Sequence, residues 1–198
     1  KKNMKKRIFD IIISVFAIII LSPLFLLISI VIKLTSKGPI FFIQDRIGLK
    51  GRVFKIIKFR TMINDHNSLN VVSIKNDSRI TPVGKILRKY KLDEIPELIN
   101  VLFGSMSLVG PRPDVPGYVD LLKGENRKIL TLKPGITGPA SLKYFNEEEI
   151  LSSKINPKDY NDKIIFPDKV KINLDYYYKN NIWIDIKIIF ATILKFFY

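Results

Sequence analysis

The chain has 198 residues and a formal net charge of +15; 47% of its residues are hydrophobic and 26% are charged. It has no cysteine and a single histidine, His66. This composition excludes disulfides, thiolate metal sites, cysteine nucleophiles and histidine metal clusters. The positive charge indicates a polyanionic partner. The candidates are nucleic acid, an anionic membrane surface and a phosphorylated substrate.

Residues 11–32 are uncharged and almost wholly apolar, a run long enough to cross a bilayer core as a helix. Ser22-Pro23 interrupts the run near its middle, where proline removes a backbone hydrogen bond and bends a helix. Both flanks are basic, and basic flanks stay in the cytoplasm. The pattern predicts a re-entrant helix-break-helix in residues 1–37, followed by a cytosolic domain in residues 38–198. An ordinary kinked transmembrane helix is the alternative.

The first part of the body has two strand patterns. Residues 40–44 and 53–59 read as strands joined by a turn at Gly48 and Gly51. Residues 63–80 are polar and read as a loop.

The rest of the body reads as helices and fixed loops. Residues 83–90 and 95–103 have helical spacing, and Gly104 is a C-terminal cap for the second helix. Residues 109–139 are dense in proline and glycine with apolar residues between them, which predicts fixed loops. Residues 182–198 fit an interfacial helix and a core helix equally well. The expected fold class is α/β, mostly helical with a small sheet, on a monotopic membrane protein with amphipathic interfacial helices.

Asp93-Glu94 is the strongest candidate for chemistry. The pair lies just before a predicted helix and follows a basic helix that carries Arg88. Helix N-termini hold phosphates because they offer unpaired N–H groups and a partial positive charge. One carboxylate can bind Mg²⁺ while its neighbour attacks phosphorus. Taken alone, such a pair is more often a favourable helix cap.

Fixed cations accompany this pair. Lys58 and Arg60 lie on one face at the end of the second strand, followed by the hydroxyl of Thr61. Arg112 stands between two prolines, which lowers the entropy lost when it grips a phosphate. A solvated strand end and a rigid surface turn are the simpler interpretations.

Several motifs occur in a fixed order along the chain. They are Lys6-Arg7-Ile8-Phe9-Asp10, Leu21-Ser22-Pro23, Lys58-x-Arg60-Thr61-Met62, Leu92-Asp93-Glu94-Ile95-Pro96-x-Leu98, Met106-Ser107-Leu108-Val109-Gly110-Pro111-Arg112-Pro113, Pro134-Gly135-Ile136-Thr137-Gly138 and Asp175-Tyr176-Tyr177. Together they resemble the bacterial sugar transferase family, the monotopic phosphoglycosyl transferases. The resemblance spans nearly the whole chain, and several motifs in register are far more specific than any one.

The resemblance implies a two-step transfer. Asp93 would attack the sugar-linked phosphorus of a UDP-sugar, release UMP and carry the phospho-sugar. Polyprenyl (undecaprenyl) phosphate would then take that group, giving a polyprenyl diphosphate-sugar. Glu94 would ligate Mg²⁺. The residues expected to bind substrate or phosphate are Lys58, Arg60, Thr61, Arg88, Arg112, Asp175 and Tyr176.

The resemblance also implies a setting. The chain looks like the minimal catalytic unit, acting at the cytoplasmic face of a bacterial inner membrane in the first membrane step of glycoconjugate synthesis. Its expected partners are membrane lipids, with a homodimer and downstream glycosyltransferases as further partners.

Two departures from the family pattern stand out. Ser105 occupies a position where the family commonly has aspartate, which bears on a supporting contact and not on the nucleophile. After Gly138 the chain continues with Pro139 instead of the common Ala-Gln, and residues 139–171 have no assignable pattern. The identity of the sugar is therefore open.

Three alternatives compete with this interpretation. A non-catalytic membrane scaffold would use the basic surface to hold anionic lipid or a partner enzyme. A nucleic-acid-binding protein fits the charge, but no recognition helix or nucleic-acid motif is visible, so no nucleic acid is expected as a partner. The third keeps the fold and lets the lipid phosphate attack directly, without a covalent intermediate.

Overall fold

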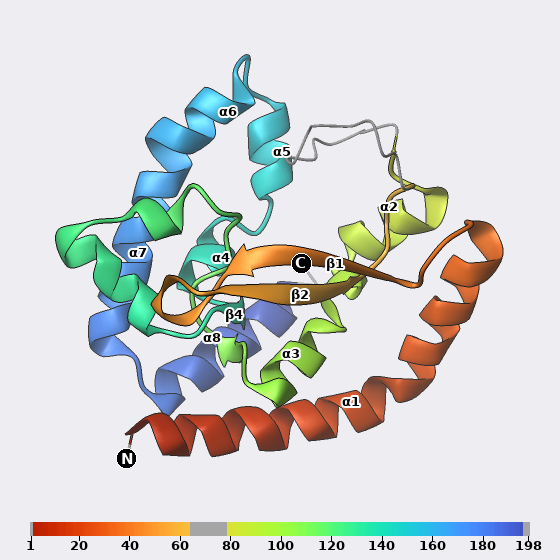
Figure 1. The fold of residues 1–198 in the computed structure, drawn as a ribbon, viewed down its shortest axis with the longest axis horizontal. Helices are drawn as coiled ribbons and strands as arrows, with labels where there is room; N and C mark the ends of the chain where they lie inside the picture. Colours follow the sequence, from red (N-terminus) through yellow and green to blue (C-terminus); the bar gives the residue numbers. More distant parts are fainter. Residues whose placement is uncertain (1, 64–78, 196–198) are drawn as a thin grey trace.

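The computed structural model describes residues 2–63 and 79–195, so most of the segment predicted as a loop, residues 63–80, lies outside the described residues. Within them, the chain forms a mostly helical body with two small sheets (Figure 1). The helices are α1 (Lys2–Thr35), α2 (Pro82–Lys89), α3 (Glu97–Phe103), α4 (Pro139–Lys143), α5 (Glu147–Ser152), α6 (Pro157–Tyr160), α7 (Phe166–Lys179) and α8 (Ile182–Leu194). The strands are β1 (Phe41–Ile47), β2 (Val53–Phe59), β3 (Ser107–Val109) and β4 (Gly135–Thr137).

The helix α1 has 34 residues and contains Pro23. Proline has no N–H to donate to the carbonyl four residues earlier, which belongs to Ile19. The Ser22 hydroxyl donates to that same carbonyl at 2.8 Å and satisfies it. Figure 1 shows α1 running along one side of the body and then bending, as a proline permits. The break predicted at Ser22-Pro23 is therefore a bend within one continuous helix.

Within the described residues, α1 is the one helix long and apolar enough to cross a membrane, over Met4–Thr35. Both halves of the helix nevertheless pack on the body. The first half contacts the central hydrophobic cluster through Phe9 and Ile13, and the second half is buried against the end of β2 through Ile28 and Ile32.

Polar contacts tie both ends of α1 to this body. Near the start of the helix, the Lys6 ammonium lies 2.5 Å from the Asp185 carboxylate of α8. Beyond the end of the helix, Arg60 donates to the carbonyl oxygens of Ser36 at 2.9 Å and Lys37 at 2.5 Å. The start and the end of the apolar segment thus lie against one and the same body.

Each sheet has two strands. β1 and β2 form the predicted antiparallel hairpin, in which Phe41 faces Phe59. β3 and β4 form a parallel pair in which Ser107 faces Gly135, and the sequence predicted only loops for β4. The two segments approach closely, since a Cβ on Gly135 would lie 2.1 Å from the Gly110 nitrogen. Strands this short have too few residues to show a period-two pattern.

The two predicted central helices are confirmed as α2 and α3. Gly104 ends α3 with a φ of 89°, a left-handed value that glycine adopts without strain.

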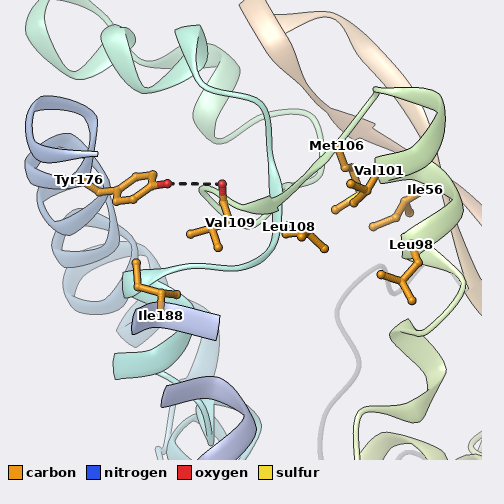
Figure 2. Packing of buried hydrophobic residues seen from close by; sticks show 8 residues of the cluster. All are labelled: Ile56, Leu98, Val101, Met106, Leu108, Val109, Tyr176 and Ile188. Atoms are coloured by element: carbon orange, nitrogen blue, oxygen red, sulfur yellow. Dashed lines mark hydrogen bonds between the residues drawn. The ribbon is translucent and has the colours of Figure 1, made fainter. Parts of the chain in front are cut away.

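The central hydrophobic cluster joins β2, α3, β3, α7 and α8 (Figure 2). The Tyr176 hydroxyl lies 3.5 Å from the carbonyl oxygen of Val109 across this cluster. Its buried members are Ile56, Leu98, Val101, Met106, Leu108, Val109, Tyr176 and Ile188.

The helix α8 has one face in the core and one face exposed. Ile188 belongs to the central cluster and Asp185 is buried, whereas Trp183 and Phe190 are exposed. The predicted C-terminal helix is confirmed over its described residues, and it combines a core face with an exposed apolar face.

Candidate active site

Asp93 and Glu94 lie in a 3-10 turn, Leu92–Glu94, between α2 and α3. The chain enters the turn through Lys91, whose φ of 51° is left-handed. Ile95 and Pro96 separate the turn from α3, so the two carboxylates lie near the start of that helix and not within its first turn.

Two cations hold the Glu94 carboxylate. The Lys58 ammonium lies 2.8 Å from Glu94 Oε1, and a guanidinium nitrogen of Arg112 lies 2.5 Å from the same oxygen. Burial opposes ionisation of Glu94, but the charges of Arg112 and Lys58 outweigh it and hold the pKa of this carboxyl well below its usual range. Glu94 is therefore an ionised, fixed carboxylate.

Asp93, its neighbour, has a different environment. Its side chain is half-buried and, in the described part of the chain, makes no hydrogen bond or ion pair. Burial and the charge of Glu94 raise the pKa of Asp93 to about 6, against the opposing charges of Lys58 and Arg88. Among the described residues, Asp93 is a carboxylate without a bonded partner, and it lies close to the cations Lys58, Arg88 and Arg112.

A third carboxylate, Glu97, lies in the same cluster. Its side chain is 2% exposed, and its Oε1 lies 3.1 Å from the Lys58 ammonium. Burial raises the pKa of Glu97 to about 7, helped by the charge of Glu94. Glu97 was not among the residues predicted for the site; the available signal was a charged residue in α3, whose other residues are apolar except for Asn100.

Arg88 extends the site toward α5. A guanidinium nitrogen of Arg88 lies 2.5 Å from the carboxylate of Glu148, and the Lys91 ammonium lies 4.2 Å from the centre of the Phe145 ring. Part of the unassigned segment 139–171 therefore faces α2 and the turn that carries Asp93.

Arg60 and Thr61 are not joined to the carboxylates. Arg60 is 4% exposed and donates to Ser36 and Lys37, at the end of α1. The backbone carbonyl of Thr61 accepts from the N–H of Thr81 at 2.9 Å. These contacts fix the surrounding chain.

Asp175 and Tyr176 also lie apart from the cluster. Asp175 pairs with Lys179 on the surface of α7 at 2.7 Å. The Tyr176 hydroxyl donates to Asp185 at 2.5 Å within the core. No hydrogen bond or ion pair joins either residue to Asp93 or Glu94 in the described part of the chain. Of the predicted site residues, the structure brings together Lys58, Asp93, Glu94 and Arg112, with Arg88 nearby.

Ser105, one of the two departures from the family pattern, makes a supporting contact. Its hydroxyl donates to the Asn100 carbonyl oxygen at 3.1 Å and accepts from the Asn100 side chain at 3.2 Å. As expected, this position contacts the scaffold of the site and not Asp93.

The carboxylates suit a hard cation. Within residues 2–63 and 79–195, no group of three or more His, Cys, Asp or Glu side chains gathers closely enough to hold a metal ion by itself. Mg²⁺ is usually bound through one or two carboxylates together with substrate phosphates. Glu94, whose pKa is held well below its usual range, supplies an ionised carboxylate of that kind. The donor set fits a magnesium ion that shares its coordination with a substrate.

The fold and the site define a protein with a long apolar helix and a cluster of carboxylates and cations suited to phosphorylated ligands. A family model described as bacterial sugar transferase matches residues 1–198. The chain belongs to the bacterial sugar transferase family.

Curated relatives agree with this assignment. The chain is 40% identical over 195 residues to a UDP-glucose:undecaprenyl-phosphate glucose-1-phosphate transferase of Klebsiella pneumoniae, with 96% of this chain and 39% of that protein covered. It is 37% identical to a UDP-N-acetylgalactosamine-undecaprenyl-phosphate N-acetylgalactosaminephosphotransferase of Aeromonas hydrophila, covering 95% of this chain and 42% of the relative. It is 37% identical to the exopolysaccharide production protein PSS of Rhizobium leguminosarum bv. phaseoli, with 96% of this chain and 94% of that protein covered. The chain thus spans about two fifths of the length of the first two relatives and nearly all of the third.

Proposed function

We propose that the chain is a phosphoglycosyl transferase that moves a sugar 1-phosphate from a UDP-sugar to undecaprenyl phosphate. The observation that carries this proposal is the contrast between two adjacent carboxylates. Glu94 is held by Lys58 and Arg112, whereas Asp93 has no bonded partner in the described part of the chain. A nucleophile has to be free to approach phosphorus, and a cation ligand has to be fixed and ionised.

The first step forms a covalent intermediate. An Asp93 oxygen bonds to the phosphorus that carries the sugar, the bond from that phosphorus to the bridging oxygen breaks, and UMP leaves with this oxygen. Lys58, Arg88 and Arg112 stabilise the charge on the phosphate oxygens, which is the dominant contribution in phosphoryl transfer. Glu94 would hold a magnesium ion, and this ion would supply further positive charge to neutralise the phosphate oxygens.

The second step regenerates the carboxylate. An oxygen of the lipid phosphate bonds to the same phosphorus, the bond to Asp93 breaks, and a polyprenyl diphosphate-sugar leaves. The names of the Klebsiella and Aeromonas relatives support the nucleotide donor and the lipid acceptor. Because those names carry different sugars, the donor sugar is left to experiment.

The apolar segment suits an acceptor that stays in the membrane. We propose that α1 re-enters the cytoplasmic leaflet of the bacterial inner membrane and does not cross it. Both ends of α1 are tied to one body, through Lys6 at the start and through Arg60 at the end. A helix whose two ends contact the same body cannot place those ends on opposite sides of the bilayer unless the body also crosses the bilayer. A homodimer and contacts with downstream glycosyltransferases stay predictions.

The function is tested by UMP release. The purified chain is mixed in nanodiscs with Mg²⁺, undecaprenyl phosphate and a panel of UDP-sugars that includes UDP-glucose and UDP-N-acetylgalactosamine. We expect UMP release with one or a few donors, none from Asp93→Asn, and unchanged release from Asp45→Asn, the matched control on β1 in the exposed pair with Lys55. A radiolabelled phospho-sugar retained on the protein without acceptor would identify the covalent route. Equal UMP release by wild type and Asp93→Asn would refute the assignment of Asp93 as the nucleophile. A folded protein that releases no UMP with any donor would favour the non-catalytic membrane scaffold.

A further inference from the structure

Glu97 is a buried carboxylate of the site to which the proposed reaction assigns no part. Its side chain is 2% exposed, and it lies on α3 next to the turn that carries Asp93 and Glu94. Burying a carboxylate is costly unless ion pairs and hydrogen bonds compensate fully. For Glu97 the compensation is partial, because its Oε1 makes no hydrogen bond of good geometry. A costly charge of this kind inside a site calls for a functional explanation.

Lys58 lies between two carboxylates. Its ammonium is 2.8 Å from Glu94 Oε1 and 3.1 Å from Glu97 Oε1. Glu94 Oε1 also receives Arg112 at 2.5 Å, so one oxygen serves two cations. In the described part of the chain, Glu97 has Lys58 as its one ion-pair partner. The two glutamates therefore differ, since Glu94 is shared and Glu97 is dedicated to Lys58.

The backbone fixes the separation between Glu97 and Lys58. Asn100, one turn after Glu97 on α3, bonds to the backbone of β2 on two sides. The N–H of Ile57 donates to Asn100 Oδ1 at 3.0 Å, and Asn100 Nδ2 donates to the carbonyl oxygen of Lys55 at 2.8 Å. The helix that carries Glu97 and the strand that carries Lys58 are thereby held in register next to each other.

We propose, resting on the proposed function, that Glu97 is a positioning residue that keeps the Lys58 ammonium in the site when the substrate engages Glu94. An arriving diphosphate competes with Glu94 for Lys58 and Arg112. The cation that accompanies the diphosphate competes with Lys58 and Arg112 for Glu94. The side chain of Arg112 is more exposed than that of Lys58, so Arg112 can turn from Glu94 to the phosphate oxygens. Lys58 keeps Glu97 as a partner and so stays directed at the reacting phosphorus. Without Glu97, Lys58 pairs with Glu94 alone and obstructs the carboxylate that the substrate needs.

A double-mutant cycle tests this coupling. UMP release is measured for wild type, Glu97→Gln, Lys58→Met and the double variant, with Glu125→Gln on the surface as a control that keeps full activity. Glutamine matches the shape of glutamate and removes its charge. We expect Glu97→Gln to lower kcat about tenfold while the donor KM changes less than about twofold. In the Lys58→Met background the same substitution changes kcat less than about twofold, because the residue through which it acts is gone.

Thermal unfolding provides a readout that does not depend on activity. Glu97→Gln replaces a partly compensated buried charge with a neutral group of the same size and leaves Lys58 paired with Glu94. We therefore expect its melting temperature to equal or exceed that of wild type. An equal fractional loss of kcat in both backgrounds, or a lowered melting temperature that accounts for the lost activity, would overturn the positioning role alone. A folded wild type that releases no UMP from any donor would overturn the proposed function, and the positioning role with it.

Discussion

Lys6 near the start of α1 and Asp185 in α8 form an ion pair of 2.5 Å across 179 positions of sequence. The side chain of Asp185 is 1% exposed, and the same carboxylate accepts the hydroxyl of Tyr176 from α7. One buried carboxylate thus joins the apolar N-terminal helix to the last two helices of the body.

Breaking this pair should destabilise the protein. Lys6→Met leaves the Asp185 charge buried without its cation, and removal of one partner of a buried pair costs about 3 kcal/mol or more. Thermal unfolding in detergent measures the effect. Lys179→Met, which breaks the exposed pair with Asp175, is the control and should cost less than about 1 kcal/mol. Equal losses for the two variants would show that Asp185 does not anchor α1.

The re-entrant arrangement of α1 can be tested by labelling, because the chain has no cysteine of its own. Lys5→Cys and Lys37→Cys place single thiols near the two ends of the apolar segment. In oriented vesicles, an impermeant maleimide should label both positions from the same side, since both ends are tied to one body. Labelling of the two positions from opposite sides would establish a membrane-crossing helix instead.

Arg60 is expected to act on stability and not on donor binding. Its guanidinium donates to two carbonyl oxygens and one hydroxyl at residues 36 and 37, an arrangement that lysine cannot reproduce. We expect Arg60→Lys to lower the melting temperature and to leave the donor KM within about twofold of wild type. A raised KM at unchanged stability would instead support the phosphate-binding role predicted for Arg60 from the sequence.

Gly38 provides an independent check on the contact made by Arg60. A Cβ at Gly38 would lie 2.0 Å from Arg60 Nη1, whereas nothing lies within 4 Å of a Cβ at Gly117. Both glycines have positive φ, 122° and 101°. Alanine at either position adds backbone strain of about 1–3 kcal/mol. Gly38→Ala should destabilise the protein more than Gly117→Ala, because it also has to displace Arg60.

Asp114 should make stability depend on pH. Burial raises the pKa of Asp114 to about 6, against the opposing charges of Lys169 and Arg46. An unfolded aspartate titrates near about 3.9, so the folded state binds more protons between these two values. Asp114 therefore lowers stability as the pH rises from about 4 to about 6. Asp114→Asn should be more stable than wild type at pH 7 and lose this advantage near pH 4, as measured by unfolding at both pH values. Asp45→Asn, in an exposed pair with Lys55, should show no such difference.

Features that depend on a short stretch of chain were predictable from the sequence. The β1–β2 hairpin follows from alternating residues around two glycines, and the end of α3 follows from Gly104. Several short motifs in a fixed order along the chain, among them the one around Asp93 and Glu94, predicted the family, which the family model and the curated relatives confirm. Each of these signals lies within about a dozen neighbouring residues, where local backbone preference and side-chain periodicity act.

The partners of the charged residues were decided by the tertiary structure. From sequence, Lys58 and Arg60 look equivalent, two cations on one strand end, yet one lies between Glu94 and Glu97 and the other holds residues 36 and 37. Nothing near Glu97 in the sequence indicates that Lys58 lies beside it. A charge buried in a fold is stabilised by whatever opposite charge the packing brings within a few ångströms, and that neighbour comes from a distant segment. The sequence alone therefore determines which residues are available for chemistry, while the packing of α1, β2 and α3 determines which of them meet.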